Sequence, residues 1–285
     1  MANAPVAIPQ VYTAVPRAEQ PSVASRILQS VLPPVLMGLV LVVVYIWARN
    51  SLEPHRQFLM PDAAGLWTQA FGLAEVRWEL LDRGLTTITI AVVGMGVSIP
   101  IGMILGIVMF RFHVMEKAFF PYLVALQSIP ILAIIPLIQS ALGFGFMPKV
   151  LIVALFTFFA IPTTLLLGLK STDRGIIDLF KLQGVNWLVI LRKAGLPSAA
   201  PALFAGLRIS AGLAVIGAIV SELFFLAGRG GLGQMLINAK MDFKYEQMYA
   251  ALIASSALSI AVYLFFSWLG NRLFADWHES GGKSA

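Results

Sequence analysis

The sequence predicts an all-α, polytopic integral membrane protein with six transmembrane helices. Of its 285 residues, 59% are apolar and only 12% are charged, which is far more apolar than a soluble domain of this length. Long apolar blocks alternate with short polar segments, and each block approaches or exceeds the length needed to cross ~30 Å of hydrocarbon. The chain contains no cysteine, which excludes a disulfide framework and thiolate metal sites.

The first apolar block sets the organisation of the N-terminal part. It runs from Val31 to Trp47, too late and too long for an ordinary cleaved signal peptide. The polar stretch after it carries Trp67, Phe71 and Trp78, which suit a membrane interface. We predict five parts along the chain: a mobile cytoplasmic tail (1–30), a first transmembrane helix (31–48), an extracytoplasmic interfacial segment (49–83), a membrane core (84–270) with a cytoplasmic loop at 170–199, and a cytoplasmic tail (271–285).

The core contains five further apolar blocks. The second span carries Gly102 and Gly106, whose spacing permits close approach of another helix, although glycine can also be merely tolerated there. The third span carries Pro121, Pro130 and Pro136 beside polar residues, a pattern that suits a broken helix. The five predicted spans are Gly84–Phe110, Phe119–Leu142, Val150–Leu169, Ala200–Ala227 and Tyr249–Leu269.

Several polar side chains are expected at membrane depth. They can either satisfy neighbouring helices or line a path for a solute, and both interpretations stay open. Glu222 in particular can pair with Arg229, or it can line the exit of such a path. The candidate path residues are Gln127, Gln139, Thr157, Thr163 and Glu222.

The loop at 170–199 is polar, yet apolar residues recur through it at helical spacing. Gly184 can end a first short helix with a positive φ, and Pro197 is expected to stop a second one. Pro201 is expected to open the next membrane helix. These features predict a docking surface, and the alternative is an ordinary cytoplasmic loop at the membrane surface.

The details of this loop resemble a known pattern. Asp178-Leu-Phe-Lys-Leu-Gln-Gly184, then nine residues, then Ala194-Gly-Leu-Pro197 is similar to the EAA loop of binding-protein-dependent ABC importer permeases. That pattern reads Glu-Ala-Ala, three residues, Gly, nine residues, Ile-x-Leu-Pro. Gly184, Leu196 and Pro197 match it, Asp178 stands for the Glu, and Leu179, Phe180 and Ala194 depart from it. The implied ATPase-coupling residues are Asp178, Phe180, Gly184, Val185, Trp187, Arg192, Leu196 and Pro197.

Further motifs extend the resemblance to about residues 58–270. Gln127-Ser-Ile-Pro130, Ile135-Pro136, Gly143-Phe-Gly145 and Pro148-Lys149 resemble the nitrate, sulfonate, taurine and thiamine-precursor group of these permeases. The resemblance implies the type I (MetI-like) permease fold, a bacterial plasma (inner) membrane location, and transport of a small anion or small polar organic solute. It also implies two ABC ATPase subunits that carry ATP and Mg, an extracytoplasmic substrate-binding protein and a second copy of the permease.

The net charge of the chain and its distribution favour a lipid bilayer as partner. The net charge of +6 is spread over loops, without the dense basic run interleaved with aromatics that favours nucleic acid, so we expect a bilayer and no nucleic acid as partner. The loops assigned to the inside carry slightly more Lys and Arg than those outside, which favours cytoplasmic placement of both termini.

Residues for catalysis or cofactor binding are not apparent. His55, His113 and His278 are far apart in the sequence, and Gly281-Gly-Lys-Ser284 lacks the earlier glycine and following helix of a phosphate-binding loop. We therefore expect no catalytic residue, metal or cofactor on this chain, and ATP hydrolysis on separate subunits. A secondary carrier or channel, with Glu222 as a proton relay, is the alternative function, and a membrane-bound enzyme is a third.

Overall fold

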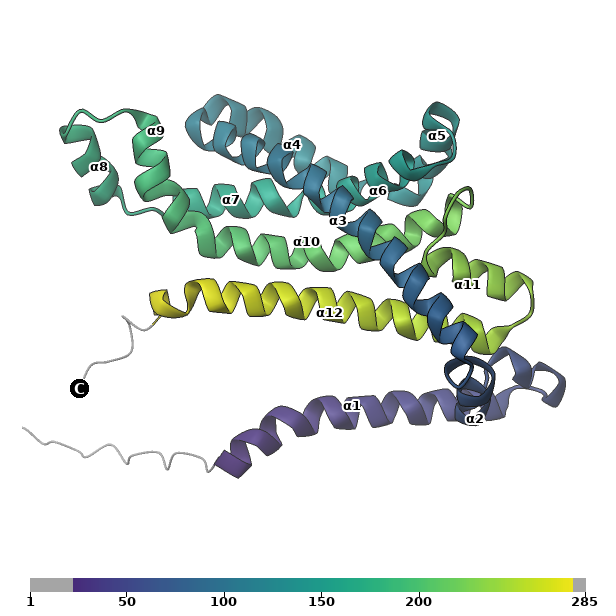
Figure 1. Cartoon of the computed structure of the whole chain (residues 1–285). Helices are drawn as coiled ribbons and strands as arrows, with labels where there is room; N and C mark the ends of the chain where they lie inside the picture. The colour runs from purple at the N-terminus through teal and green to yellow at the C-terminus, as the bar shows by residue number, and fades with distance from the viewer. Residues whose placement is uncertain (1–22, 279–285) are drawn as a thin grey trace, which may run out of the picture. The chain divides into compact units, whose positions relative to one another are not determined.

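The computed structural model describes the backbone of residues 23–278 and the side chains of residues 32–273, and every regular element in that range is helical (Figure 1). The outer parts of the two predicted tails, 1–22 and 279–285, lie outside the described residues. Within the described residues, five helical segments are long and apolar enough to cross a membrane, or six when the bent pair His113–Ser128 and Ile131–Leu142 is counted as one span. The all-α, polytopic prediction is therefore confirmed. The chain divides into two compact units between Met60 and Pro61.

The first unit contains one long apolar helix. Helix α1 (Val23–Ser51) includes an apolar segment of 20 residues, Leu32–Ser51, where the sequence predicts residues 31–48. After the helix ends, a 3₁₀-helix (Pro54–Leu59) follows, and the Arg49 Nε donates to the Met60 carbonyl oxygen at 2.9 Å. This bond fixes the chain that leaves the helix.

The second unit holds the remaining elements. Two of them are short π-helical turns, Trp67–Phe71 and Leu191–Gly195. The helices are α2 (Ala63–Leu66), α3 (Ala74–Arg111), α4 (His113–Ser128), α5 (Ile131–Leu142), α6 (Phe146–Phe158), α7 (Ala160–Lys170), α8 (Arg174–Leu182), α9 (Trp187–Ile190), α10 (Leu196–Phe224), α11 (Leu232–Met241) and α12 (Tyr245–His278).

Helix α3 begins ten residues before the predicted start of the second span at Gly84. Its polar first turns are helical because Val76 and Leu80, one turn apart, are buried against Leu232 and Met235. Arg83 also pairs with Glu79 at 3.1 Å in the favourable i, i+4 arrangement. The charged residues before Gly84, which marked the edge of the span in the sequence, therefore belong to the same helix as the span.

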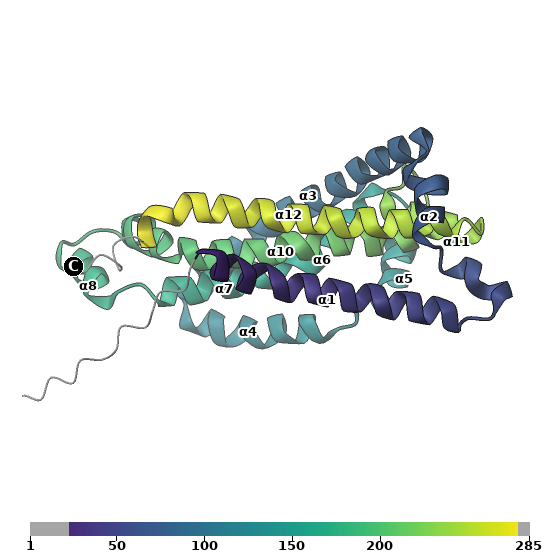
Figure 2. The same cartoon turned by 90° about the horizontal axis from the view of Figure 1, so that it is seen from below.

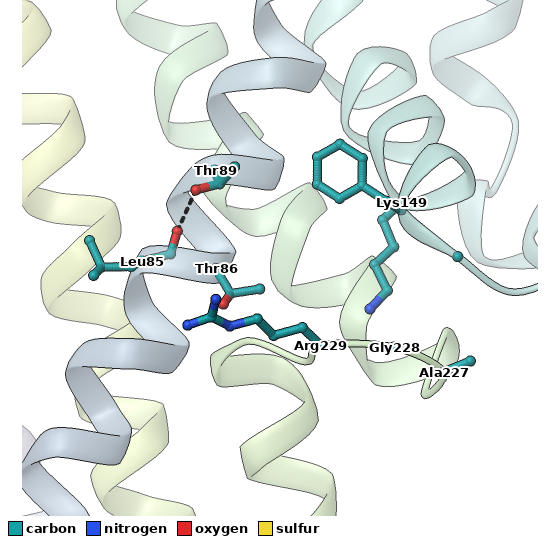
Figure 3. A pocket seen from close by; sticks show the side chains of 9 residues that line it. Leu85, Thr86, Thr89, Lys149, Ala227, Gly228 and Arg229 are labelled. Atoms are coloured by element: carbon teal, nitrogen blue, oxygen red, sulfur yellow. Dashed lines mark hydrogen bonds between the residues drawn. The ribbon is translucent and has the colours of Figure 1, made fainter.

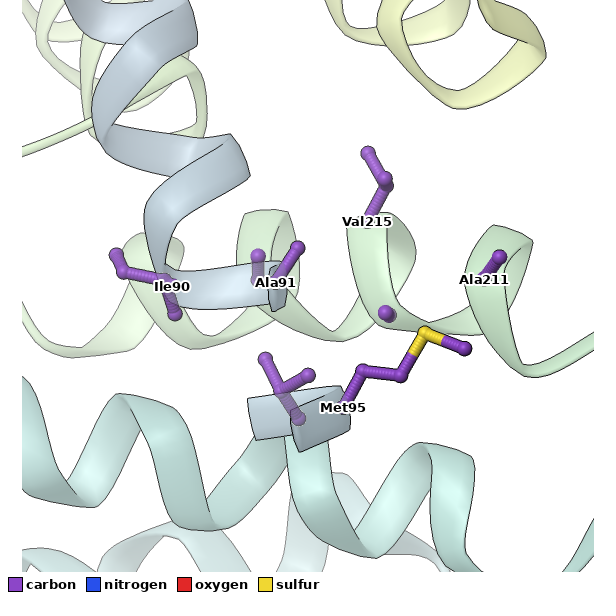
Figure 4. Close-up of a cluster of buried hydrophobic side chains, with 8 residues drawn as sticks. Ile90, Ala91, Met95, Ala211 and Val215 are labelled. Atoms are coloured by element: carbon purple, nitrogen blue, oxygen red, sulfur yellow. The ribbon is translucent and has the colours of Figure 1, made fainter. Parts of the chain in front are cut away.

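The centre of the second unit is a cluster of small and medium apolar side chains. It joins Ile90 and Met95 of α3 and Val153 of α6 to Ala211 and Val215 of α10 (Figure 4). Alanines on α10 let these helices approach closely, because little side chain separates the backbones.

The glycine pair of α3 serves the same purpose against α7. A Cβ added to Gly102 would lie 2.9 Å from the Ile161 Cβ, and one added to Gly106 would lie 3.1 Å from the Leu165 side chain. The predicted close approach at these two glycines is confirmed.

The third predicted span is broken. Helices α4 and α5 meet at Ile129–Pro130 with an angle of 94° between them. Proline cannot continue the hydrogen bonds of α4, and it restricts the residue before it to extended backbone, so the chain turns there. Figures 1 and 2 show α8 and α9 at one end of the second unit and α5 and α11 at the other.

Candidate functional site

The segment between α7 and α10 forms two short helices joined by a bend. The Asp173 side chain caps α8 by accepting from the Gly175 N–H at 2.7 Å, and the Asn186 side chain caps α9. Between them Gly184 has a φ of 68°, a left-handed conformation that glycine adopts without steric cost. The sequence predicts this bend at this glycine.

Helix α8 presents an apolar row outward. Ile176, Leu179 and Leu182 follow at intervals of three residues and are exposed, Leu182 at 87%. Asp178 is exposed and pairs with Lys181 at 3.0 Å, while Phe180 is half-buried. Sequence reasoning did not single out Leu182, although its spacing from Leu179 carries the signal. We call Ile176, Leu179 and Leu182 the α8 row.

Helix α9 is anchored to the core. Trp187 packs, together with Leu196, beside a buried cluster that includes Leu169 and Leu191, and the Arg111 guanidinium lies 5.3 Å from the centre of the Trp187 ring. Of the other predicted coupling residues, Val185 is half-buried and Arg192 is exposed. The segment therefore has an outward helix, α8, and an inward helix, α9.

The expectation that Pro197 stops the second short helix is wrong. The backbone stays helical from Trp187 to Phe224 through the π-helical turn Leu191–Gly195, and Pro197 lies in the first turn of α10. A π-helical turn changes which carbonyls accept bonds, so proline directly after it does not break the helix as it would inside a regular one. Pro201 likewise lies inside α10 rather than at its start.

The predicted path residues do not gather in one place. Gln127 and Thr163 line a hollow of about 470 Å³ beside the break between α4 and α5, together with aliphatic and aromatic side chains. Thr157 is buried, and its hydroxyl oxygen lies 2.6 Å from that of Ser98. Gln139 donates to the Phe224 carbonyl oxygen at 2.9 Å. Thr157 and Gln139 thus join helices to one another.

Glu222 holds three elements together at the end of α10. Both carboxylate oxygens lie 3.0 Å from the Thr87 hydroxyl, and Oε2 also accepts from the Gly233 N–H at 2.8 Å. The Thr87 oxygen in turn accepts from the Leu232 N–H at 2.9 Å. The side chain is fully buried, so these bonds replace its hydration.

Pairing of Glu222 with Arg229, one of the two sequence-based interpretations, is wrong. Arg229 instead forms an ion pair with Asp82. Sequence reasoning also missed Lys149, which is buried in the first turns of α6. Among the residues whose side chains the structure describes, no cluster of His, Asp and Glu is placed to hold a metal ion.

The helical bundle with its broken third span defines a polytopic membrane protein, and comparison with known proteins gives its family. Residues 98–275 match the family of binding-protein-dependent transport system inner membrane components. The chain belongs to this family, the permease subunits of ABC importers.

Curated relatives cover most of the chain. The formylaminopyrimidine transport permease protein ThiX of Halalkalibacterium halodurans is 32% identical over 243 residues, covering 85% of this chain and 94% of the relative. The riboflavin transport system permease protein RibX of Chloroflexus aurantiacus is 32% identical over 245 residues, covering 85% of this chain and 89% of the relative.

A solved structure shares the fold. A chain of the MetNI methionine ABC transporter in an inward-facing conformation superposes with a TM-score of 0.58 at 20% identity, covering 72% of this chain and 98% of that one. The predicted MetI-like fold is therefore confirmed. Location in the inner membrane follows from the family and the apolar helices.

Proposed function

We infer that this permease forms the path for a small anion or small polar organic solute, which an extracytoplasmic substrate-binding protein delivers. The hollow beside the break between α4 and α5 supports a path there, because Gln127 and Thr163 bring polar groups to a cavity between apolar helices. The names of the relatives support the solute class, since formylaminopyrimidine and riboflavin are polar organic molecules.

We further propose that separate ATPase subunits drive the permease through α8 and α9. The α8 row carries this proposal, because three exposed apolar side chains on a capped helix form a face suited to a groove on a partner. Since Trp187 anchors the adjoining α9 in the core, movement of a partner docked on α8 reaches α10.

The remaining parts of the assembly follow from this arrangement. Two ATPase subunits would carry ATP and Mg, and two copies of the permease would enclose the path. The end with α8 and α9 would face the cytoplasm, with both termini of the chain on that side. The end with α5 and α11 would face the binding protein.

The experiment that tests coupling compares two leucines. In proteoliposomes with the ATPase and binding-protein partners, Leu182→Asp is expected to abolish ATP-driven uptake, since a carboxylate disrupts an apolar contact. The control is Leu81→Asp, which alters an exposed leucine of α3 at the opposite end and is expected to retain uptake. Full uptake in Leu182→Asp would contradict the coupling role, and uptake by the permease without any ATPase would contradict the proposed function as a whole.

A further inference from the structure

A second pocket lies at the end of the unit opposite α8 and α9. It has a volume of about 400 Å³, within the range of small-ligand sites. Helix α3, the start of α6 and the turn after α10 contribute its walls (Figure 3). The lining residues are Leu85, Thr86, Thr89, Gly145, Phe146, Lys149, Ala227, Gly228 and Arg229.

Lys149 is the unusual member of this lining. Its side chain is only 2% exposed, and Figure 3 shows the ammonium group reaching toward Gly228 at the wall of the pocket. Among the described residues, Lys149 forms no ion pair and no side-chain hydrogen bond. The Lys149 Nζ is not among the buried side-chain atoms that lack a partner, so the small exposed part of this residue includes its Nζ, which is accessible from the pocket. An anion in the pocket would therefore meet a cation that has no partner among the described residues.

Glu222 attracts Lys149 electrostatically but forms no ion pair with it. Its carboxylate oxygens are already bonded to the Thr87 hydroxyl and the Gly233 N–H. Glu222 is also absent from the pocket lining. The ammonium of Lys149 therefore keeps its donors available to a molecule in the pocket.

The rest of the lining also favours an anion. Arg229 adds a second cation at a more exposed position, although Asp82 already holds part of its guanidinium. The hydroxyl groups of Thr86 and Thr89 donate to backbone carbonyls of their own helix, so the two cations are the main donors that the lining offers to an anion. Among the described residues, the charged side chains that line this pocket are Lys149 and Arg229, of which Lys149 has no carboxylate partner.

We propose that this pocket, which we call the Lys149 pocket, receives an anionic group of the transported solute: a carboxylate, sulfonate or phosphate. The inference rests on the proposed function, in which the chain conducts a small solute and this end faces outward. Lys149 supplies the buried charge, and Arg229 supplies a second donor nearer the opening.

The test uses inorganic sulfate as the probe. The purified transporter, in nanodiscs of phosphatidylcholine, is titrated with sodium sulfate at constant ionic strength while its thermal unfolding midpoint is followed. Sulfate is expected to raise the midpoint of the unmodified protein, because a ligand that binds only the folded state stabilises it. Lys149→Met is expected to lose this shift, and Lys149→Arg is expected to retain it.

A matched control separates the pocket from general charge effects. Lys240→Met removes the same charge from an exposed position on α11 and is expected to keep the sulfate shift. Arg229→Gln keeps the inference testable if Lys149→Met fails to fold, and it is expected to reduce the shift. A shift retained in both Lys149→Met and Arg229→Gln, or lost equally in Lys240→Met, would overturn the proposal.

A lipid phosphate is the other source of this chemistry. Repeating the titration in nanodiscs that contain phosphatidylglycerol is expected to leave the sulfate shift in place. Loss of the shift in these nanodiscs would show that a lipid phosphate occupies the pocket instead.

The unfolding measurement does not depend on transport activity, so it can fail independently of the proposed function. Absence of a shift alongside normal ATP-driven uptake would overturn the Lys149 pocket alone, whereas ATP-independent uptake would overturn the proposed function.

Discussion

At the scale of single residues, Glu222 shows how a buried carboxyl group can be structural. It accepts from a side chain of α3 and from the backbone at the start of α11, so one residue connects three helices. Replacement by a group that cannot accept leaves the buried Gly233 N–H without a partner.

We therefore expect Glu222→Ala to destabilise the fold. Losing the acceptor costs about 1–3 kcal/mol for the buried Gly233 N–H that is left unsatisfied. The Thr87 hydroxyl still has the Arg83 carbonyl oxygen as an acceptor at 3.2 Å. Glu222→Gln is the control, because its amide oxygen still accepts from Gly233 and its amide nitrogen can donate to Thr87. Thermal unfolding in detergent measures both variants. Equal midpoints for Glu222→Ala and the unmodified protein would contradict the bracing role.

At the scale of elements, close packing of α3 depends on which glycine faces a neighbour. Gly102 and Gly106 lie against α7, whereas a Cβ on Gly96 would meet nothing within 4 Å. Helices in lipid gain little from burying apolar surface, so close backbone approach carries much of their association. The position of a glycine on α3, rather than the number of glycines, therefore decides whether it contributes to helix packing.

Gly102→Ala and Gly96→Ala make a matched pair. The first is expected to cost about 1–3 kcal/mol, because its methyl group would meet the Ile161 side chain and push α3 from α7. The second is expected to be neutral or stabilising by up to about 1 kcal/mol, since alanine is the better helix former. Unfolding midpoints compared side by side test this. Similar unfolding midpoints for the two variants would contradict the packing role of Gly102, because α7 would then accommodate the added methyl group without loss of stability.

At the scale of the whole molecule, one continuous helical segment reaches from α9 through the membrane. It covers 38 residues from Trp187 to Phe224, which at ~1.5 Å per residue is about 57 Å. One end adjoins the α8 row, and the other carries Glu222 close to the start of α11. The π-helical turn fixes the rotation of α9 relative to α10.

Deleting Ser198, in the first turn of α10 directly after the π-helical turn, tests the importance of this rotation. Loss of one residue from an α-helix turns α9 by about 100° relative to the rest of α10 and removes Trp187 from its contacts. ATP-driven uptake is expected to fall to background while the bundle still inserts in the membrane. Ser198→Ala, which preserves the register, is expected to retain uptake. Normal uptake after the deletion would show that rotation of α9 is unimportant.

Sequence reasoning reached the membrane class, the bend at Gly184 and a break in the third span, because glycine permits a positive φ and proline interrupts a helix locally. It did not say which of Pro121, Pro130 and Pro136 marks the break, which the structure places at Pro130. It placed the start of α3 too late, because burial of Val76 and Leu80 depends on α11 and α12, far along the chain. It missed the helical path through Pro197 since a π-helical turn has no strong sequence signature. One of its two interpretations of Glu222 paired this residue with Arg229 because the two are close in the sequence, whereas folding brings Thr87 to Glu222 and Asp82 to Arg229.

The 94° angle between α4 and α5 also interrupts the backbone hydrogen bonding of the third span. The 16 residues of α4 rise only ~24 Å, less than the ~30 Å thickness of bilayer hydrocarbon. The last carbonyl groups of one helix and the first N–H groups of the next have no partners within their own helices. Where an unbroken apolar helix presents only hydrocarbon, a broken one thus brings backbone donors and acceptors that can bind a polar molecule.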